Sequence, residues 1–302
     1  MAQIGVMIEA QEGLNWERWR RVVRDAERLG FASLRTSDHC WSVFGVEGRE
    51  SLSAWPALTA AAAWTERIQI GPMVSPITFY VPAVLGRMAR AVDELSGGRL
   101  ILGLGTGWNQ AEHERFGIPF PSWRRRFDAL EAGIERVRQT FGERPIPLLI
   151  GGGGERRTIP LAARVASEWN LNLGDPDDFR ARSALLDQHC RAIGRDPAQI
   201  RRSVMRPYLI GRDPEELGRR AARLAEVIPG LRDLPPGDVL RALRERGALV
   251  GTPQEVIELM RPLAEAGAEL FMLQHFLLDD PDHLELLASE VLPAVAEMRP
   301  AA

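Results

Sequence analysis

Two short apolar runs each end in a cluster of glycines, an arrangement typical of a site that binds a phosphate group. Residues 100–104 lead into Gly105-Thr106-Gly107, and residues 146–150 lead into Gly151 to Gly154. Glycines directly after a buried strand let backbone N–H groups approach a ligand that side chains would block. A helix that starts after such a loop adds the positive end of its dipole. One such loop could be a tight turn without a ligand, but the two together predict one phosphate-bearing ligand.

One histidine is a candidate for proton transfer. His39 follows Asp38 at the expected carboxyl end of a strand. An imidazole titrates close to neutral pH, so it can accept or donate a proton as a reaction proceeds. A lone histidine is often only structural, yet this position favours a catalytic role, and we predict that His39 is catalytic.

The tripeptide Glu112-His113-Glu114 contains metal-ligating residue types but is not predicted to bind a metal. Adjacent residues on a helix point in different directions, and no second histidine stands at a ligand spacing. We expect these residues to lie at the surface, and we predict no metal site in the chain.

Other residues could complete a ligand site. Arg156 lies near the start of the helix after the second glycine cluster, where it could bind a phosphate or simply be solvated. His275 comes just after the last expected strand and could line the mouth of a substrate pocket. Aromatic residues that could form walls for a substrate or a cofactor, or simply pack, are Trp41, Phe44, Phe79 and Trp108.

The composition excludes several classes of protein. The chain has no lysine, so all 38 basic side chains are arginine, and Schiff-base, pyridoxal-phosphate and Walker A chemistry are excluded. A net charge of −3 without a basic stripe gives no sign of a nucleic-acid partner. No apolar stretch approaches the roughly 18 residues that span a bilayer, and no leader is evident. Two distant cysteines fit a reducing compartment, so we expect a cytoplasmic protein with no membrane partner.

Short apolar strands alternate with amphipathic helices along the whole chain, which predicts a parallel sheet. Eight strands favour a closed (β/α)₈ TIM barrel over an open sheet, and in a barrel the site lies at the carboxyl ends of the strands. We predict a single domain over residues 1–302, with a small insertion over about 229–249 before the last strand. The expected strands cover residues 4–8, 32–36, 68–74, 100–104, 146–150, 169–173, 204–210 and 270–274.

Several motifs together resemble the luciferase-like monooxygenase superfamily, and most closely its branch of F420-dependent oxidoreductases. They are Thr36-Ser37-Asp38-His39, GPMVSPITFYVP at 71–82, GLGTGWNQAEHERFGIPF at 103–120, PLLIGGGG at 147–154, and Leu249-Val250-Gly251-Thr252-Pro253. The resemblance implies that a flavin-like ring lies across the barrel mouth with its phosphate at the glycine loops. It also implies that Met73-Val74 is a bulged cis peptide behind the ring. The cofactor-binding residues that it implies are Asp38, His39, Met73, Val74, Thr106, Gly107, Gly151, Gly152, Gly153, Gly154 and Arg156.

The resemblance implies an oxidoreductase that moves a hydride between C5 of coenzyme F420 and a small organic substrate, with His39 handling the proton. An FMN-dependent monooxygenase that takes reduced flavin from a partner reductase and uses oxygen is the alternative. A barrel that only stores or senses the cofactor also stays open. The resemblance further implies a homodimer. Related sugar-phosphate dehydrogenases carry a glutamate where this chain has Trp108, and they use lysines, so sugar-phosphate oxidation is not expected.

Overall fold

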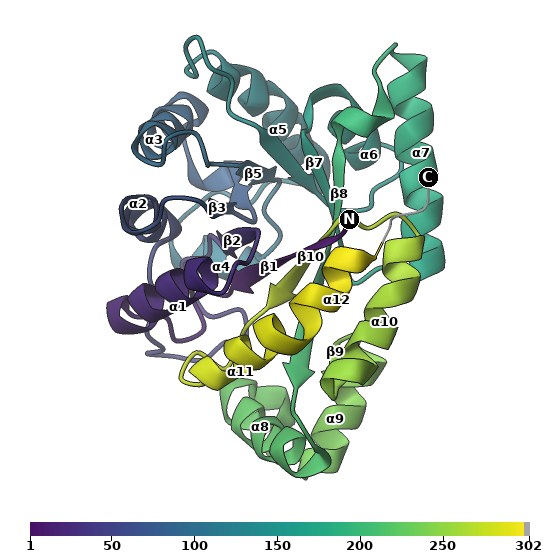
Figure 1. Ribbon diagram of the computed structural model, residues 1–302. Helices are drawn as coiled ribbons and strands as arrows, with labels where there is room; N and C mark the ends of the chain where they lie inside the picture. The colour runs from purple at the N-terminus through teal and green to yellow at the C-terminus, as the bar shows by residue number, and fades with distance from the viewer. Residues whose placement is uncertain (299–302) are drawn as a thin grey trace.

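The strands form a nearly closed parallel barrel, seen in a computed structural model that describes residues 1–298 (Figure 1). Their order is β3-β2-β1-β10-β8-β7-β6-β5-β4, and a bridge between Ile70 and Leu100 brings the two ends of this order together. The predicted barrel is therefore confirmed. Its strands are β1 (Gln3–Ile8), β2 (Ser33–Thr36), β3 (Gln69–Pro72), β4 (Ser75–Pro76), β5 (Leu102–Gly105), β6 (Leu148–Gly151), β7 (Glu168–Asn172), β8 (Arg201–Ile210) and β10 (Leu270–Gln274).

Two features of the barrel differ from the strands expected from the sequence. The run over 68–74 is not one strand, because the Met73–Val74 peptide bond is cis and separates β3 from β4. This cis bond is the one that the family resemblance implied. The chain also has an unpredicted short strand, β9 (Leu249–Gly251), which pairs only with Tyr208–Ile210 at the end of β8.

The helices surround the barrel, and half of those within residues 1–298 begin at a side-chain cap. Asp175, Asp213 and Asp280 each accept a hydrogen bond from the backbone N–H three residues later, and Thr252 forms a full capping box with Glu255. The helices are α1 (Trp16–Arg28), α2 (Ala54–Trp64), α3 (Pro82–Leu95), α4 (Gln110–Arg115), α5 (Trp123–Arg138), α6 (Thr158–Val165), α7 (Pro176–Ala192), α8 (Pro214–Val227), α9 (Pro236–Glu245), α10 (Pro253–Glu265), α11 (Pro281–Leu286) and α12 (Leu292–Glu297).

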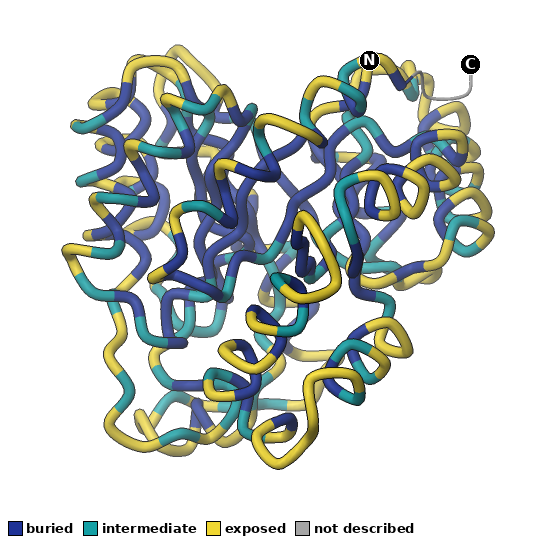
Figure 2. Tube along the Cα trace, turned by 60° about the horizontal axis from the view of Figure 1, so that its bottom comes forward, coloured by how far each residue is buried: buried dark blue, intermediate teal, exposed yellow. Residues whose placement is uncertain are grey.

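The predicted insertion forms a small unit beside the barrel mouth. It holds a 3₁₀ turn, Pro229–Leu231, and helix α9, which packs against α8 (Figure 1). Side chains of α8, α9 and β9 build a second hydrophobic core that is separate from the main core between strands and helices. In both regions the buried residues follow the strands and the inward faces of the helices (Figure 2). The insertion is thus a packed wall, not a loose loop.

A charged group lies inside the barrel near the amino ends of its strands. Arg35 of β2 is fully buried, and its guanidinium lies 3.3 Å from the carboxylate of Glu168 on β7. Burial lowers the pKa of Arg35 to about 10, which still leaves it charged at neutral pH. Ser203 donates to Glu168 (2.8 Å) and accepts from Asn170 (2.9 Å), so hydrogen bonds connect the charged pair to the barrel mouth. Buried ions need an opposite charge and hydrogen-bond partners, and this network supplies both inside the barrel.

Candidate active site

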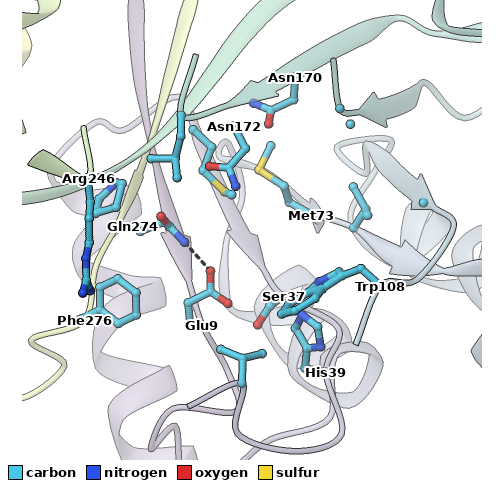
Figure 3. Close-up of a pocket in the computed structure, with 18 of the residues that line it drawn as sticks. Glu9, Ser37, His39, Met73, Trp108, Asn170, Asn172, Arg246, Gln274 and Phe276 are labelled. Atoms are coloured by element: carbon cyan, nitrogen blue, oxygen red, sulfur yellow. Dashed lines mark hydrogen bonds between the residues drawn. The ribbon is translucent and has the colours of Figure 1, made fainter. Parts of the chain in front are cut away.

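A cavity of about 540 Å³ opens at the carboxyl ends of the strands, where active sites of such barrels lie (Figure 3). Its lining is mostly apolar with a few polar groups, the usual make-up of a small-molecule site. Of the residues predicted from sequence, those that line it are His39, Phe44, Met73, Val74, Thr106, Gly107, Trp108, Gly151 and Gly152.

His39 is held on the cavity wall by a buried carboxylate. Its Nδ1 lies 2.8 Å from Oε2 of Glu112, whose side chain is only 1% exposed. The other ring nitrogen, Nε2, has no partner within residues 1–298, so it is available to a ligand. Burial acts to lower the pKa of His39, but the hydrogen bond and charge of Glu112 outweigh it, so the pKa lies above its usual value. The pair can therefore hold and release a proton at Nε2 near neutral pH.

The expectation that residues 112–114 lie at the surface was wrong for Glu112 and His113, which are both buried. Asn109 caps α4, and Glu112 in the first turn of this helix contacts the backbone that follows His39. Oε1 of Glu112 accepts hydrogen bonds from the backbone N–H groups of Cys40 and Trp41. Sequence spacing gave no signal for this, because the two segments lie more than 70 residues apart and only the barrel joins them.

Asp38 lies behind the cavity wall and does not line it. It accepts hydrogen bonds from Ser75 and, at 2.9 Å, from the Tyr80 hydroxyl. Its burial raises the pKa of this carboxyl group. Because Ser75 follows the cis bond directly, Asp38 ties the end of β2 to the bulge formed by Met73 and Val74. Asp38 is thus a structural contact behind the part of the cavity wall that Met73 and Val74 form.

The glycine loops present bare backbone to the cavity. Gly107 has a φ of +74°, and a Cβ there would come within 2.7 Å of Thr78 Oγ1. Gly152 has a φ of +112°, which also favours glycine. Beyond the cavity lining, the N–H groups of Gly153 and Gly154 have no hydrogen bond within the described residues, and α6 starts at Thr158. Unpaired donors before a helix start fit a phosphate.

Arg156 and three predicted wall residues lie outside the cavity. Arg156 is exposed and makes no ion pair within residues 1–298, and it borders a separate hollow beside α6. Trp41 lies under the Arg115 guanidinium, and Phe79 packs on His113. His275 is 2% exposed, and its Nδ1 bonds Tyr208, which itself lines the cavity. Burial lowers the pKa of His275 to about 4, so this ring is neutral.

The structure adds five polar cavity residues that the sequence analysis did not single out. Glu9 lies between the two sides of the cavity and accepts a hydrogen bond of 2.6 Å from Gln274 (Figure 3). Asn170 and Asn172 come from β7, and Arg246 follows α9. A signal was present for three of them, since Glu9, Asn172 and Gln274 are polar residues at or just after the carboxyl end of an apolar strand. Asn170 lies in the middle of β7. Arg246 had no such signal.

A parallel barrel with a cavity and a buried acid–base pair at its carboxyl edge is the architecture of a TIM-barrel enzyme. The chain belongs to the luciferase-like monooxygenase family, whose model matches residues 1–270.

Relatives in this family include an F420-dependent hydroxymycolic acid dehydrogenase of Mycobacterium tuberculosis, 28% identical over 96% of this chain and 87% of that protein. An FMNH(2)-dependent dimethylsulfone monooxygenase of Pseudomonas putida is 23% identical over 92% and 88%. The solved structure of an F420-dependent secondary alcohol dehydrogenase with an F420-acetone adduct has a TM-score of 0.80 at 19% identity, covering 97% and 99%.

These relatives are all oxidoreductases, and their names contain both cofactor classes that the sequence predicted, F420 and FMN. The predictions of family, enzyme class and cofactor class are therefore confirmed. None of the helices within residues 1–298 has the length and apolar character needed to cross a membrane.

Proposed function

We propose that this protein is an F420-dependent oxidoreductase that moves a hydride between C5 of the deazaflavin and a small organic substrate. The observation that carries the proposal is the Glu112–His39 pair, with its free Nε2 on the wall of a cavity that the glycine loops border. The relatives named for F420 support the choice of cofactor.

The residues present fit such a cofactor. Thr106, Gly107, Gly151 and Gly152 would border the chain of the cofactor, and the unpaired N–H groups of Gly153 and Gly154 would bind its phosphate. The exposed Arg156 would add a positive charge. Met73 and Val74 would back the ring. When bound, F420 supplies or accepts a hydride at C5 and reacts poorly with oxygen.

His39 would handle the proton that accompanies the hydride. In a reduction, its Nε2 delivers a proton to the oxygen of a carbonyl substrate as the carbon is reduced. In the reverse direction the same nitrogen takes the proton from an alcohol. Glu112 keeps the ring in place and stabilises its protonated form, while the apolar lining limits access of water to the reacting atoms.

The first experiment compares binding of F420 and FMN to the purified protein by fluorescence titration. Preference for F420, followed by substrate-dependent reoxidation of reduced F420 without oxygen uptake, is the expected result. Preference for FMN with oxygen consumption would instead identify a flavin monooxygenase. Tight F420 binding without turnover of any alcohol, ketone, enone or imine would indicate a storage or sensor protein.

A second experiment tests the role of His39. His39→Ala should lower kcat by about 10²- to 10⁴-fold, the usual contribution of a general acid or base, while the Kd for the cofactor changes little. His189→Ala is the matched control, because His189 lies on α7 away from the cavity. Unchanged turnover in His39→Ala would refute the proposed role. A homodimer also remains a proposal, which sedimentation analysis can test.

A further inference from the structure

The cavity has a second side, opposite to the proton-transfer pair. His39 and Trp108 lie on one side, Arg246 and Phe276 lie on the other, and Glu9 and Gln274 lie between them (Figure 3). The lining of the second side comes from the insertion and its neighbours. It includes Phe44, Leu224, Ile228, Leu243, Ala248 and Phe276.

This second side is a firm apolar wall. Three of its residues belong to the small second core and are largely buried there: Leu224 and Ile228 at the end of α8, and Leu243 of α9. The rings of Phe44 and Phe276 extend this surface, with centroids 6.2 Å apart. A packed, preformed apolar surface can bind a hydrocarbon chain without first having to become ordered.

Arg246 is the one cation besides His39 among the residues that line the cavity. Its guanidinium makes no hydrogen bond or ion pair within residues 1–298. The two arginines within α9 do have partners: Arg241 pairs with Asp238, and Arg244 donates to the Val250 carbonyl. Glu9, the one acidic residue among those that line the cavity, already accepts hydrogen bonds from Gln274 and Gln11. Arg246 therefore places at the cavity a guanidinium group whose N–H donors have no partner within residues 1–298.

The backbone that carries Arg246 is fixed. Gly247 ends α9 with a φ of +78°, and the Ala248 N–H bonds the Leu243 carbonyl, which closes the helix in a Schellman-type cap. Buried Arg206 of β8 then donates to the Gly247 carbonyl at 3.0 Å and anchors this turn on the barrel. The fold thus fixes the backbone position of Arg246 at the edge of the cavity, while its exposed side chain has no hydrogen-bond partner within residues 1–298.

We infer that this side of the cavity binds the far end of the substrate, and that this end is an apolar chain terminated by a carboxylate held by Arg246. The planar guanidinium matches a carboxylate with two parallel hydrogen bonds, and the apolar wall suits the chain between that group and the reacting carbon. The inference rests on the proposed function for the reaction at the other end. The substrate class is then an oxo- or hydroxy-acid with a hydrocarbon spacer.

The first test measures binding without any cofactor, so its result does not depend on F420. Octanoate and octanol are titrated by calorimetry into the wild type, Arg246→Gln and the control Arg241→Gln. We expect octanoate to bind the wild type more tightly than octanol, and Arg246→Gln to lose about ten- to hundredfold in octanoate affinity with little change for octanol. Arg241→Gln should behave as the wild type.

Three results would overturn the inference: equal affinity of the wild type for octanoate and octanol, an unchanged octanoate affinity in Arg246→Gln, or the same loss in the Arg241 control. A large loss of F420 or FMN affinity in Arg246→Gln, with octanoate binding unaltered, would assign the arginine to the cofactor instead. Circular dichroism confirms that each variant is folded.

The second test separates this inference from the proposed function. Reduction by reduced F420 is followed for an oxo-octanoate and for the methyl ketone of equal chain length. A higher kcat/KM for the oxo-acid that disappears in Arg246→Gln supports both statements. Turnover of the ketone without any preference for the acid refutes the carboxylate site alone. Specific octanoate binding without F420 turnover leaves the site in place and refutes the F420 reaction.

Discussion

Replacing Glu112 by glutamine tests how this carboxylate controls His39. The two oxygens of Glu112 have separate partners: Oε1 accepts the backbone N–H groups of Cys40 and Trp41, and Oε2 faces Nδ1 of His39. A glutamine can keep its oxygen on the two backbone donors and place its NH₂ group against the ring. The local fold should then survive, while His39 loses both the negative charge and the acceptor at Nδ1.

The size of the effect follows from this single lost contact. A hydrogen bond to a charged group contributes about 1.5–3 kcal/mol, and 1.36 kcal/mol corresponds to roughly one pKa unit. The pKa of His39, which Glu112 holds above its usual value, should therefore fall in Glu112→Gln. Above both pKa values, the fraction of protonated His39 falls about ten- to hundredfold.

Two measurements follow this change. The pKa of His39 is read by NMR from its ring proton, and the limb of the pH–rate profile for carbonyl reduction should move to lower pH by the same amount. Glu114→Gln is the control, because Glu114 lies exposed on the same helix. A pKa and a rate limb that stay in place in Glu112→Gln would show that the carboxylate does not control the proton on His39.

Three further predictions concern stability and the glycine loops. Glu168→Gln leaves the fully buried Arg35 without this charged partner, so we expect a loss of about 3–5 kcal/mol in the free energy of unfolding, measured with urea. A loss below about 1 kcal/mol would contradict the stabilising role of the Arg35–Glu168 pair. Gly107→Ala places a Cβ on a residue with positive φ and against Thr78, so the affinity for the cofactor should fall at least tenfold and the thermal unfolding midpoint should drop. Titration and thermal melts measure the two effects. Wild-type values for both would contradict the role of Gly107 in the glycine loop. Because the pKa of His39 is raised in the folded state, its positive charge stabilises the fold at pH values below the unfolded-state pKa of about 6.5. This contribution is lost as pH rises through the folded-state pKa. The free energy of unfolding, measured at a series of pH values, should show this loss in the wild type but not in His39→Asn, and an identical pH dependence in the two proteins would refute the prediction.

Much of the site could be found from local sequence because the relevant signals are local. A glycine cluster after an apolar run requires only neighbouring residues to be recognised, and both clusters border the cavity as expected. His39 was identified by its place after a strand, and the barrel rule then set it at the mouth. Polar residues also stand at the carboxyl ends of β1, β7 and β10. The rule that barrel sites lie at the carboxyl ends of the strands therefore also predicts Glu9, Asn172 and Gln274 as site residues.

The sequence by itself determined the alternation of strands and helices, and hence the parallel barrel, because apolar periodicity and helix caps act over a few residues. It also determined which chemistry is absent, since a chain without lysine cannot form a Schiff base.

Only the tertiary structure decided the partners of the functional groups. Glu112 reaches His39, Arg206 anchors the turn beside Arg246, and the insertion becomes one wall of the cavity through contacts between segments far apart in the chain. Such contacts depend on how the whole barrel closes and which way each helix then faces. No pattern within a short stretch of sequence contains that information.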